Sequence, residues 1–336
     1  MALLYEIVES SNQKQISITG YEGTIRRLVI PEEINGLTVT EIGTGAFRGR
    51  SDLTEVHLPE SIRALKGFAF YGCTNLTSIH LYDGVEDYYD GVIRQCSSLS
   101  EITVHMHQDN YRIVKELLGD NDRQLEFSLL FPDSSSQNTP DSNWQSLDTG
   151  SSQSIDTGSY SLLSEDSMFR DIPVVQKREV RLLFPSYVNG FVEDTMARAI
   201  HLKIDGAGYP FRECVTRKGI NYREYDRVFF RAEADDDLAA ARIAILRLAY
   251  PHELTDDAKT RYRDYLYSHA DYIIRGLTDE NRTEEVSFLT GEKLIPEAAI
   301  NQAIAYASGK KRVGILSILM EAKSKQTASK GTLFSL

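Results

Sequence analysis

The sequence predicts an α+β protein, in which a short N-terminal solenoid of repeated coils precedes a mainly α-helical domain with a small β element. The solenoid is predicted by apolar residues that recur every 23 residues. The helical domain is predicted by apolar residues at helical spacing downstream of residue 186. We place the domain boundaries at residues 1–107 and 108–330, with a serine-rich loop at 133–176 inside the second domain.

Leucines 23 residues apart begin each coil of the predicted solenoid. Each leucine opens an L-x-x-Φ-x-Φ unit, in which Φ is aliphatic. The units are Leu53, Val56 and Leu58; Leu76, Ile79 and Leu81; and Leu99, Ile102 and Val104, after an earlier copy at Ile25, Leu28 and Ile30. The two Φ positions are two residues apart, so they share one face of a strand. Five extra residues near 34–38 separate the first copy from the second.

The returning half of each coil also recurs. Its pairs are Ala46-Phe47, Ala69-Phe70 and Val92-Ile93. We expect the phenylalanines to fill the space under the strands, and Gly49 and Gly72 to form tight corners. One coil cannot bury its own apolar face, but stacked coils share a continuous core. Each coil is therefore a strand plus a helical or irregular return.

These motifs occur in order in IPEEINGLTVTEIGTGAFRG and LPESIRALKGFAFYGCTNLTSIHL. The I-P, the A-F and the G-C before the next leucine recur, and the stretch of about residues 16–104 resembles the BspA-like bacterial leucine-rich repeat. The third copy departs from the pattern, with Val92-Ile93 for A-F and Gln95 for the glycine. The resemblance implies a bacterial solenoid of a kind that mostly binds proteins or surfaces and is often exported.

If the Φ residues point inward, the residues between them form columns on an open sheet face. Four of the seven histidines, including His107, would share this face. We predict that it contacts a protein partner, because solenoids usually bind through such surfaces. The predicted contact residues are Arg27, Glu55, His57, Ser78, His80, Glu101, Thr103 and His105.

A metal site or a pH-sensitive patch is the alternative interpretation of these histidines, because imidazoles bind metals and titrate near neutral pH. Neighbours across two strands are roughly 5 Å apart and diagonal ones roughly 7 Å. These distances do not force the rings to converge on one ion, and no cysteine joins them. We therefore predict no metal ligands and no cofactor.

Composition limits the function and location. The net charge of -12 disfavours nucleic-acid binding, which depends on clustered Lys and Arg. The start MALLYEIVES has no basic leader, and no run of 18 apolar residues predicts a membrane span. The three cysteines disfavour a disulfide scaffold and fit a reducing cytoplasm. We interpret Cys73 and Cys96 as small core residues rather than a redox pair. A cell-surface location is the alternative that the resemblance implies.

The serine-rich tract holds twelve serines between Asp133 and Asp171, and we predict it to be disordered. Two D-T-G-S motifs within it match the aspartic-protease signature. That chemistry requires two rigidly held carboxylates, and a polar tract lacks the apolar strands that would hold them. We interpret the motifs as a short duplication.

The flanks of the tract, 125–132 and 179–185, have the pattern of strands that end at proline. We predict that these two strands pair, with the serine-rich tract as a long loop between them. The alternative is that the tract is an interdomain linker.

Helical periodicity predicts helices at 111–118, 192–202, 238–249 and 255–275, from Pro296 to Gly309, and at 313–320. The first of these helices would cap the last coil.

The candidate nucleophile in the second domain is Cys214, near Arg212 and downstream of His201. Its flanks match no catalytic motif. We predict a non-enzymatic scaffold or regulatory protein of unknown oligomeric state. The alternatives are an enzyme or ligand sensor in 177–330, with the repeats as a targeting module, and a cell-surface adhesion protein.

Overall fold

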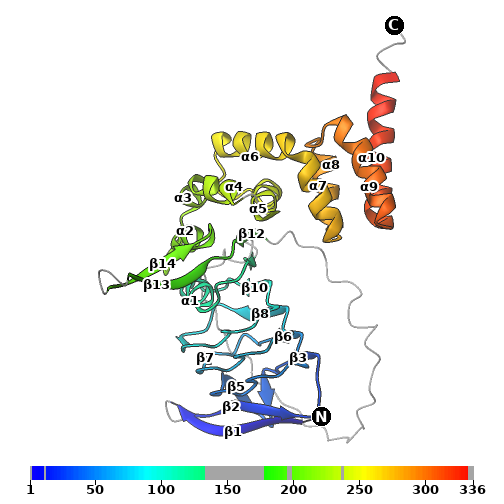
Figure 1. Cartoon of the computed structure of the whole chain (residues 1–336). Helices are drawn as coiled ribbons and strands as arrows, with labels where there is room; N and C mark the ends of the chain where they lie inside the picture. The colour runs from blue at the N-terminus through cyan, green and yellow to red at the C-terminus, as the bar shows by residue number, and fades with distance from the viewer. Residues whose placement is uncertain (1, 11–12, 133–177, 195–198, 236–237, 332–336) are drawn as a thin grey trace, which may run out of the picture.

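The computed structural model describes residues 2–10, 13–132, 178–194, 199–235 and 238–331 (Figure 1). The serine-rich tract and both D-T-G-S motifs lie outside the described residues, so the predicted loop stays a prediction. The strands are β1 (Ala2–Ser10), β2 (Gln13–Glu22), β3 (Arg27–Val29), β4 (Glu33–Ile34), β5 (Leu37–Ile42), β6 (Glu55–His57), β7 (Ala64–Leu65), β8 (Ser78–Tyr82), β9 (Asp87–Tyr88), β10 (Glu101–His105), β11 (Leu125–Leu130), β12 (Glu179–Phe184), β13 (Val188–Asp194), β14 (Ala199–Asp205), β15 (Val215–Thr216) and β16 (Gly219–Ile220). The helices are α1 (Arg112–Asp120), α2 (Gly208–Glu213), α3 (Tyr222–Arg227), α4 (Phe229–Ala234), α5 (Leu238–Ala249), α6 (Asp256–Ser268), α7 (Ala270–Asp279), α8 (Thr283–Gly291), α9 (Glu297–Gly309) and α10 (Val313–Gly331).

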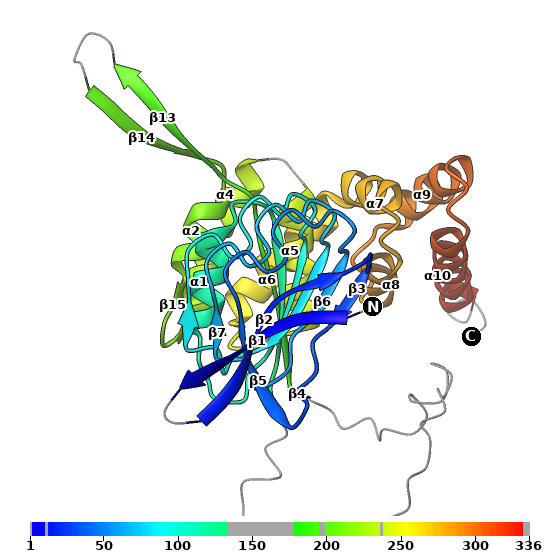
Figure 2. The same cartoon turned by 90° about the horizontal axis from the view of Figure 1, so that it is seen from below.

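The N-terminal part is a β-solenoid with a sheet on each of two sides (Figures 1 and 2). One sheet has the order β12-β11-β10-β8-β6-β3, and the other has the order β1-β2-β5-β7-β9. The predicted repeat sets the register of the first sheet. Val56 pairs with Ile79, and Ile79 pairs with Ile102, in parallel strands. The solenoid of repeated coils and the helical region that follows it are both confirmed.

The repeat residues face the core as predicted. Val56, Ile79 and Ile102 are at most 2% exposed, while the residues beside them on each strand are partly or fully exposed. The rings of Phe47 and Phe70 stack at 5.2 Å between the two sheets. Stacking therefore hides the apolar side of each coil behind its neighbour.

The N-terminal end of the solenoid is covered by a hairpin that the sequence analysis did not predict. Strands β1 and β2 pair antiparallel, and β2 pairs in parallel with β5. Ile16 and Ile18 of β2 are fully buried. The hairpin thus closes the core that the first coil would otherwise expose.

The other end of the solenoid is capped by α1, as predicted from 111–118. Ile113 and Leu117 of this helix are buried. Its last residue, Asp120, accepts hydrogen bonds from the backbone N–H groups of Gly91 and Ile93 at 3.1 and 2.9 Å. The Asp120 carboxylate thereby satisfies amide groups of the third coil that have no further coil to bind.

The sheet does not stop at the predicted boundary after residue 107. Strand β11 pairs in parallel with β10, and β12 pairs antiparallel with β11. The predicted pairing of 125–132 with 179–185 is therefore confirmed. Helix α5 packs on β12, and helices α6 to α10 lead away from it toward the C-terminus (Figure 1).

The helix predicted at 192–202 is wrong. Residues 192–194 lie in β13 and residues 199–202 lie in β14, and these two strands form an antiparallel hairpin that projects from the molecule (Figure 2). Val192 pairs with His201 of the other strand, so the helical spacing of Val192 and Ile200 arises from two different strands. Asn189-Gly190 also lies within β13.

The helix predicted at 255–275 is two helices, because the chain breaks between α6 and α7 at His269. Thr255 caps α6 as expected, since its side chain accepts a hydrogen bond from the N–H of Ala258. The predicted segments 238–249, Pro296–Gly309 and 313–320 match α5, α9 and the first half of α10. Helix α8 was not predicted.

Candidate functional site

The open face of the solenoid sheet is the candidate site, and parallel pairing fixes its columns. Arg27, Glu55, Ser78 and Glu101 lie side by side across β3, β6, β8 and β10. A second column consists of Val29, His57, His80 and Thr103. All of these side chains are partly or fully exposed. The predicted face is therefore present.

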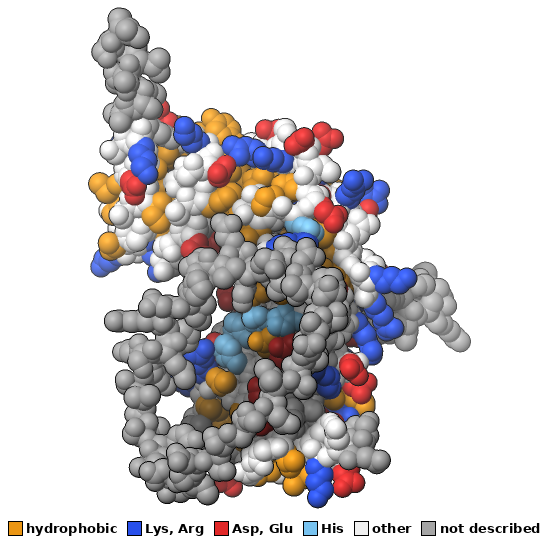
Figure 3. Space-filling view, turned by 180° about the vertical axis from the view of Figure 1, so that it is seen from behind, with side chains coloured by type: hydrophobic (Ala, Val, Ile, Leu, Met, Phe, Trp, Pro, Cys, Tyr) orange, Lys and Arg blue, Asp and Glu red, His pale blue; other side chains and the backbone are white. Residues whose placement is uncertain are grey.

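Stacked aromatic rings run across this face. The His57 and His80 rings lie 4.2 Å apart and 2° from parallel. On the next column, Tyr82 stacks on His105 at 4.5 Å, and its ring edge meets His107 at 5.2 Å. Figure 3 shows the histidines gathered in the middle of the face. The face thus presents two pairs of stacked rings side by side.

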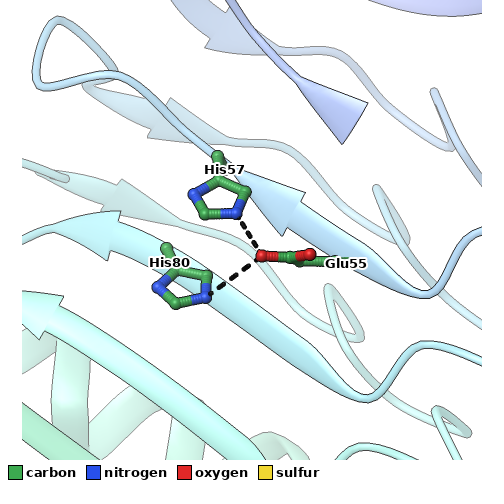
Figure 4. A group of neighbouring side chains, drawn as sticks. All are labelled: Glu55, His57 and His80. Carbon is green, nitrogen blue, oxygen red and sulfur yellow. Dashed lines mark hydrogen bonds and ion pairs between the residues drawn. The ribbon is translucent and has the colours of Figure 1, made fainter. Parts of the chain in front are cut away.

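Glu55 joins the two stacked histidines (Figure 4). Its Oε1 lies 2.5 Å from Nε2 of His57 and 3.7 Å from Nε2 of His80. Partial desolvation of Glu55 opposes ionisation, but the hydrogen bond to His57 and the nearby cations outweigh it and lower the pKa of Glu55. Desolvation, together with the charge of His57, lowers the pKa of His80. Glu55 is thus a carboxylate placed between imidazoles.

The face continues into a groove where the helical region meets the sheet. The groove has a volume of about 580 Å³ and is lined by Glu101 and Thr103 of β10, by α5, and by the start of α8. Glu126 of β11, which also lines the groove, forms an ion pair of 2.6 Å with Arg242 of α5, and both side chains are nearly buried. Helix α5 therefore packs beside the outer face at β11 and β12, while no other described element packs on the face from β3 to β8.

Sequence reasoning missed two parts of this surface. Tyr82 follows Leu81 in the repeat and occupies the same position as His105, so the register alone could have identified it. The groove residues on α5 and α8 carry no signal in the repeat, because they come from helices more than a hundred residues away in the chain. Only the fold brings them to the sheet.

Arg212 and Cys214, which the enzyme alternative names, are both buried. Arg212 is buried, and burial lowers its pKa to about 10. Its guanidinium donates hydrogen bonds to the backbone carbonyls of Leu118, Asn121, Arg123, Pro185 and Gly208. Cys214 is 2% exposed, and burial raises the pKa of its thiol to about 12. His201 lies on β14, outside the element that carries Arg212.

Cys73 and Cys96 are free thiols in the solenoid core. Both are fully buried, and their Sγ atoms donate to the carbonyls of Phe47 and Phe70 at 3.1 and 3.2 Å. Their interpretation as small core residues is confirmed by this burial.

Comparison with protein families identifies the solenoid. Residues 21–116 match the BspA type leucine rich repeat region in six copies. This segment is a BspA-type leucine-rich repeat region. The BspA-type repeats indicate a protein-interaction or surface-protein role. The C-terminal region has no family match, and no curated protein matches the chain.

Three bacterial structures are similar to the repeat region. A leucine rich repeat protein of T. pallidum is 32% identical, with a TM-score of 0.28, over 31% of this chain and 51% of that one. A leucine rich cell surface protein from Faecalibacterium prausnitzii A2-165 is 23% identical, with a TM-score of 0.26, over 31% of each chain. A leucine-rich repeat protein from Bacteroides ovatus is 14% identical, with a TM-score of 0.20, over 32% of this chain and 49% of that one. The chain thus spans about half or less of each relative.

Among the described helices, none is long and apolar enough to cross a membrane.

Proposed function

We propose that this chain is a non-enzymatic scaffold or regulatory protein that binds a protein partner through the open face from β3 to β10. The observation that carries the proposal is the row of stacked rings on that face, with His57 on His80 and Tyr82 on His105. Side chains with a ring have only two torsions to lose on binding, so they offer contact area at a low cost in conformational entropy.

The groove beside the face supports the same proposal. It is open to the sheet and walled by a second set of elements, so a partner seated on β10 would also touch α5 and α8. The helical region would then set which partners fit, since it limits how far along the sheet a partner can reach. A regulatory role would follow if a second ligand changed the position of α8.

A substitution on the face tests the proposal. The full chain carrying Glu101→Lys and His105→Glu is compared with one carrying Glu86→Lys and Thr74→Glu. The second pair makes the same charge changes at exposed positions away from the open face. Each chain is immobilised, and proteins captured from extracts of the source cells are quantified by mass spectrometry.

We expect the face variant to lose at least one protein that the wild-type chain and the control variant both retain. The retained protein is then purified, and its affinity for the three chains is measured by calorimetry. Equal capture by all three chains would rule out this face as the contact surface.

The proposal includes a cytoplasmic location, supported by three buried thiols that remain unpaired. Free cysteines persist most readily in a reducing compartment. Cell fractionation tests the location, with known cytoplasmic and surface proteins as markers. Recovery of the chain with the surface markers would favour the adhesion alternative instead.

A further inference from the structure

We propose that Glu55, His57 and His80 form a site for a divalent transition-metal ion of the zinc class on the open sheet face. Each residue offers one ligand atom, and the three atoms lie within 4.8 Å of one another. Figure 4 shows both imidazoles directed at the same oxygen of Glu55. Two imidazole nitrogens and one carboxylate oxygen form a donor set that suits zinc, with the remaining coordination positions open to water.

The backbone holds the three ligands near one another without a metal. Glu55 and His57 are two residues apart on β6, so their side chains leave the same face. His80 is the register partner of His57 on β8. The residues between them, Val56 and Ile79, are buried and fix both strands to the core. Only the side chains therefore have to move when an ion binds.

The side-chain movement is small. Ligands about 2.1 Å from a tetrahedral zinc ion lie about 3.4 Å from one another. The distance from Glu55 Oε1 to His80 Nε2 is 3.7 Å, close to that value. The distance to His57 Nε2 is 2.5 Å, so this pair must open by roughly 1 Å. The stacked rings must also tilt toward a common point, and their side chains are 26% and 32% exposed, which leaves them room.

Arg27 competes with the ion for this site. Its Nε lies 3.4 Å from Oε2 of Glu55 and 3.4 Å from Nε2 of His57. The Arg27 side chain is 58% exposed, so it can turn toward solvent. Its positive charge nevertheless opposes a dication a few ångströms away. Removal of Arg27 is therefore expected to strengthen metal binding.

The spacing of the histidines in the sequence predicts no metal ligands. In the structure, the carboxylate of Glu55 reaches both imidazole rings from the same strand face. Glu55 is two residues before His57, a spacing that is visible in the repeat. The site needs no cysteine, because His and Glu supply three ligands.

Zinc binding to the full chain tests the proposal. The chain is freed of any affinity tag and stripped of metal, and Zn²⁺ is titrated at pH 7.5 in competition with a chromophoric chelator. We expect one site, weakened at least about tenfold in His80→Gln and in Glu55→Gln, because even the loss of an outer-shell partner costs that much. His105→Gln is the matched control on the same face, and it should bind like wild type.

Two further measurements identify the ligands. Arg27→Gln should bind Zn²⁺ several-fold more tightly than wild type. Bound Co²⁺ should give the visible bands of a low-symmetry nitrogen and oxygen site, and His80→Gln should lose them while its thermal unfolding stays cooperative. No binding by the folded wild-type chain, or equal affinity in wild type and His80→Gln, would overturn the proposal.

Metal binding is measured on the chain alone, so it does not rest on the proposed partner. The partner test substitutes Glu101 and His105, neither of which is a proposed ligand. Failure of one proposal therefore leaves the other standing.

Discussion

At the scale of single residues, the helical region depends on a buried ion pair. Arg247 is fully buried and donates to both carboxylate oxygens of Asp226, at 2.7 and 2.9 Å. Tyr262 donates a hydrogen bond to the same carboxylate at 2.7 Å. Burying two charges costs free energy, and the pair recovers it only while both partners remain. The Asp226 carboxylate accepts three of these hydrogen bonds, whereas Nη1 of Arg247 is buried without a hydrogen-bond partner among the described residues.

Asp226→Asn should therefore lower the free energy of unfolding by about 3–5 kcal/mol, because it leaves the Arg247 charge buried without a counter-ion. Urea denaturation followed by circular dichroism measures the loss. The control is the double variant Asp226→Leu with Arg247→Met, which removes both charges and should be more stable than the single variant. A single variant as stable as wild type would contradict this account of the pair.

His252 gives the molecule a pH dependence. Its Nε2 lies 3.0 Å from a guanidinium nitrogen of Arg178. Burial, and then the charge of Arg178, lower the pKa of His252 from its ordinary value. The unfolded chain therefore binds a proton more readily than the folded one, and stability falls as the pH falls from about 7 through 6.5.

We expect wild type to lose more stability between pH 7.5 and pH 5.5 than His252→Gln does. Urea midpoints at the two pH values measure the difference. The substitution removes the titrating ring and leaves Arg178 in place, so the two chains differ mainly in that proton. Equal losses in both would mean that His252 does not titrate differently on folding.

At the scale of the element, the corners of the coils show where the repeat is imperfect. Gly49 and Gly72 have φ of 72° and 68°, as their positions in the repeat predict. Gln95 occupies the third corner with φ of 63°. A residue with a Cβ is strained there by about 1–2 kcal/mol, a cost that glycine avoids.

Gln95→Gly should accordingly stabilise the chain by about 0.5–1 kcal/mol, since relief of strain exceeds the added entropy of the unfolded chain. Differential scanning calorimetry should show a higher melting temperature. The reciprocal change Gly72→Gln should lower it, because a Cβ at that corner adopts the same unfavourable φ. A fall in melting temperature for Gln95→Gly would show that its side chain makes a contact worth more than the strain.

The repeat is also where sequence reasoning succeeded. The recurring leucines predicted the strands, the core residues and the columns of the open face, because every coil packs against its neighbour in the same way. The hairpin of β13 and β14 was missed because Val192 and Ile200 have helical spacing in the sequence but lie on two paired strands. The Glu55 cluster was missed because a pairwise distance rule ignores a side chain that bridges two neighbours. The groove was missed because it depends on contacts far apart in the chain.

At the scale of the whole molecule, one sheet joins the solenoid to the helices. It runs from β3 to β12, and α5 packs on its last strand. Arg242 of α5 is paired with Glu126 of β11, at 2.6 Å, and the side chains are 6% and 13% exposed. Desolvation raises the pKa of Glu126, although the charge of Arg242 opposes this effect. This pair is thus a buried electrostatic link between the repeats and the helical region.

Arg242→Met should destabilise the packing of the helices on the sheet while the coils stay folded. The substitution leaves the Glu126 carboxylate nearly buried without its counter-ion, which costs about 3–5 kcal/mol of folding free energy. Hydrogen exchange read by mass spectrometry distinguishes the two regions: α5 and α8 should lose protection, while β6 and β8 keep it. Arg242→Lys retains the positive charge but not the planar guanidinium group, so α5 and α8 should lose less protection in this variant than in Arg242→Met. If α5 and β8 lose protection equally in Arg242→Met, the chain opens as one unit, and the continuous sheet rather than this ion pair determines its cooperativity.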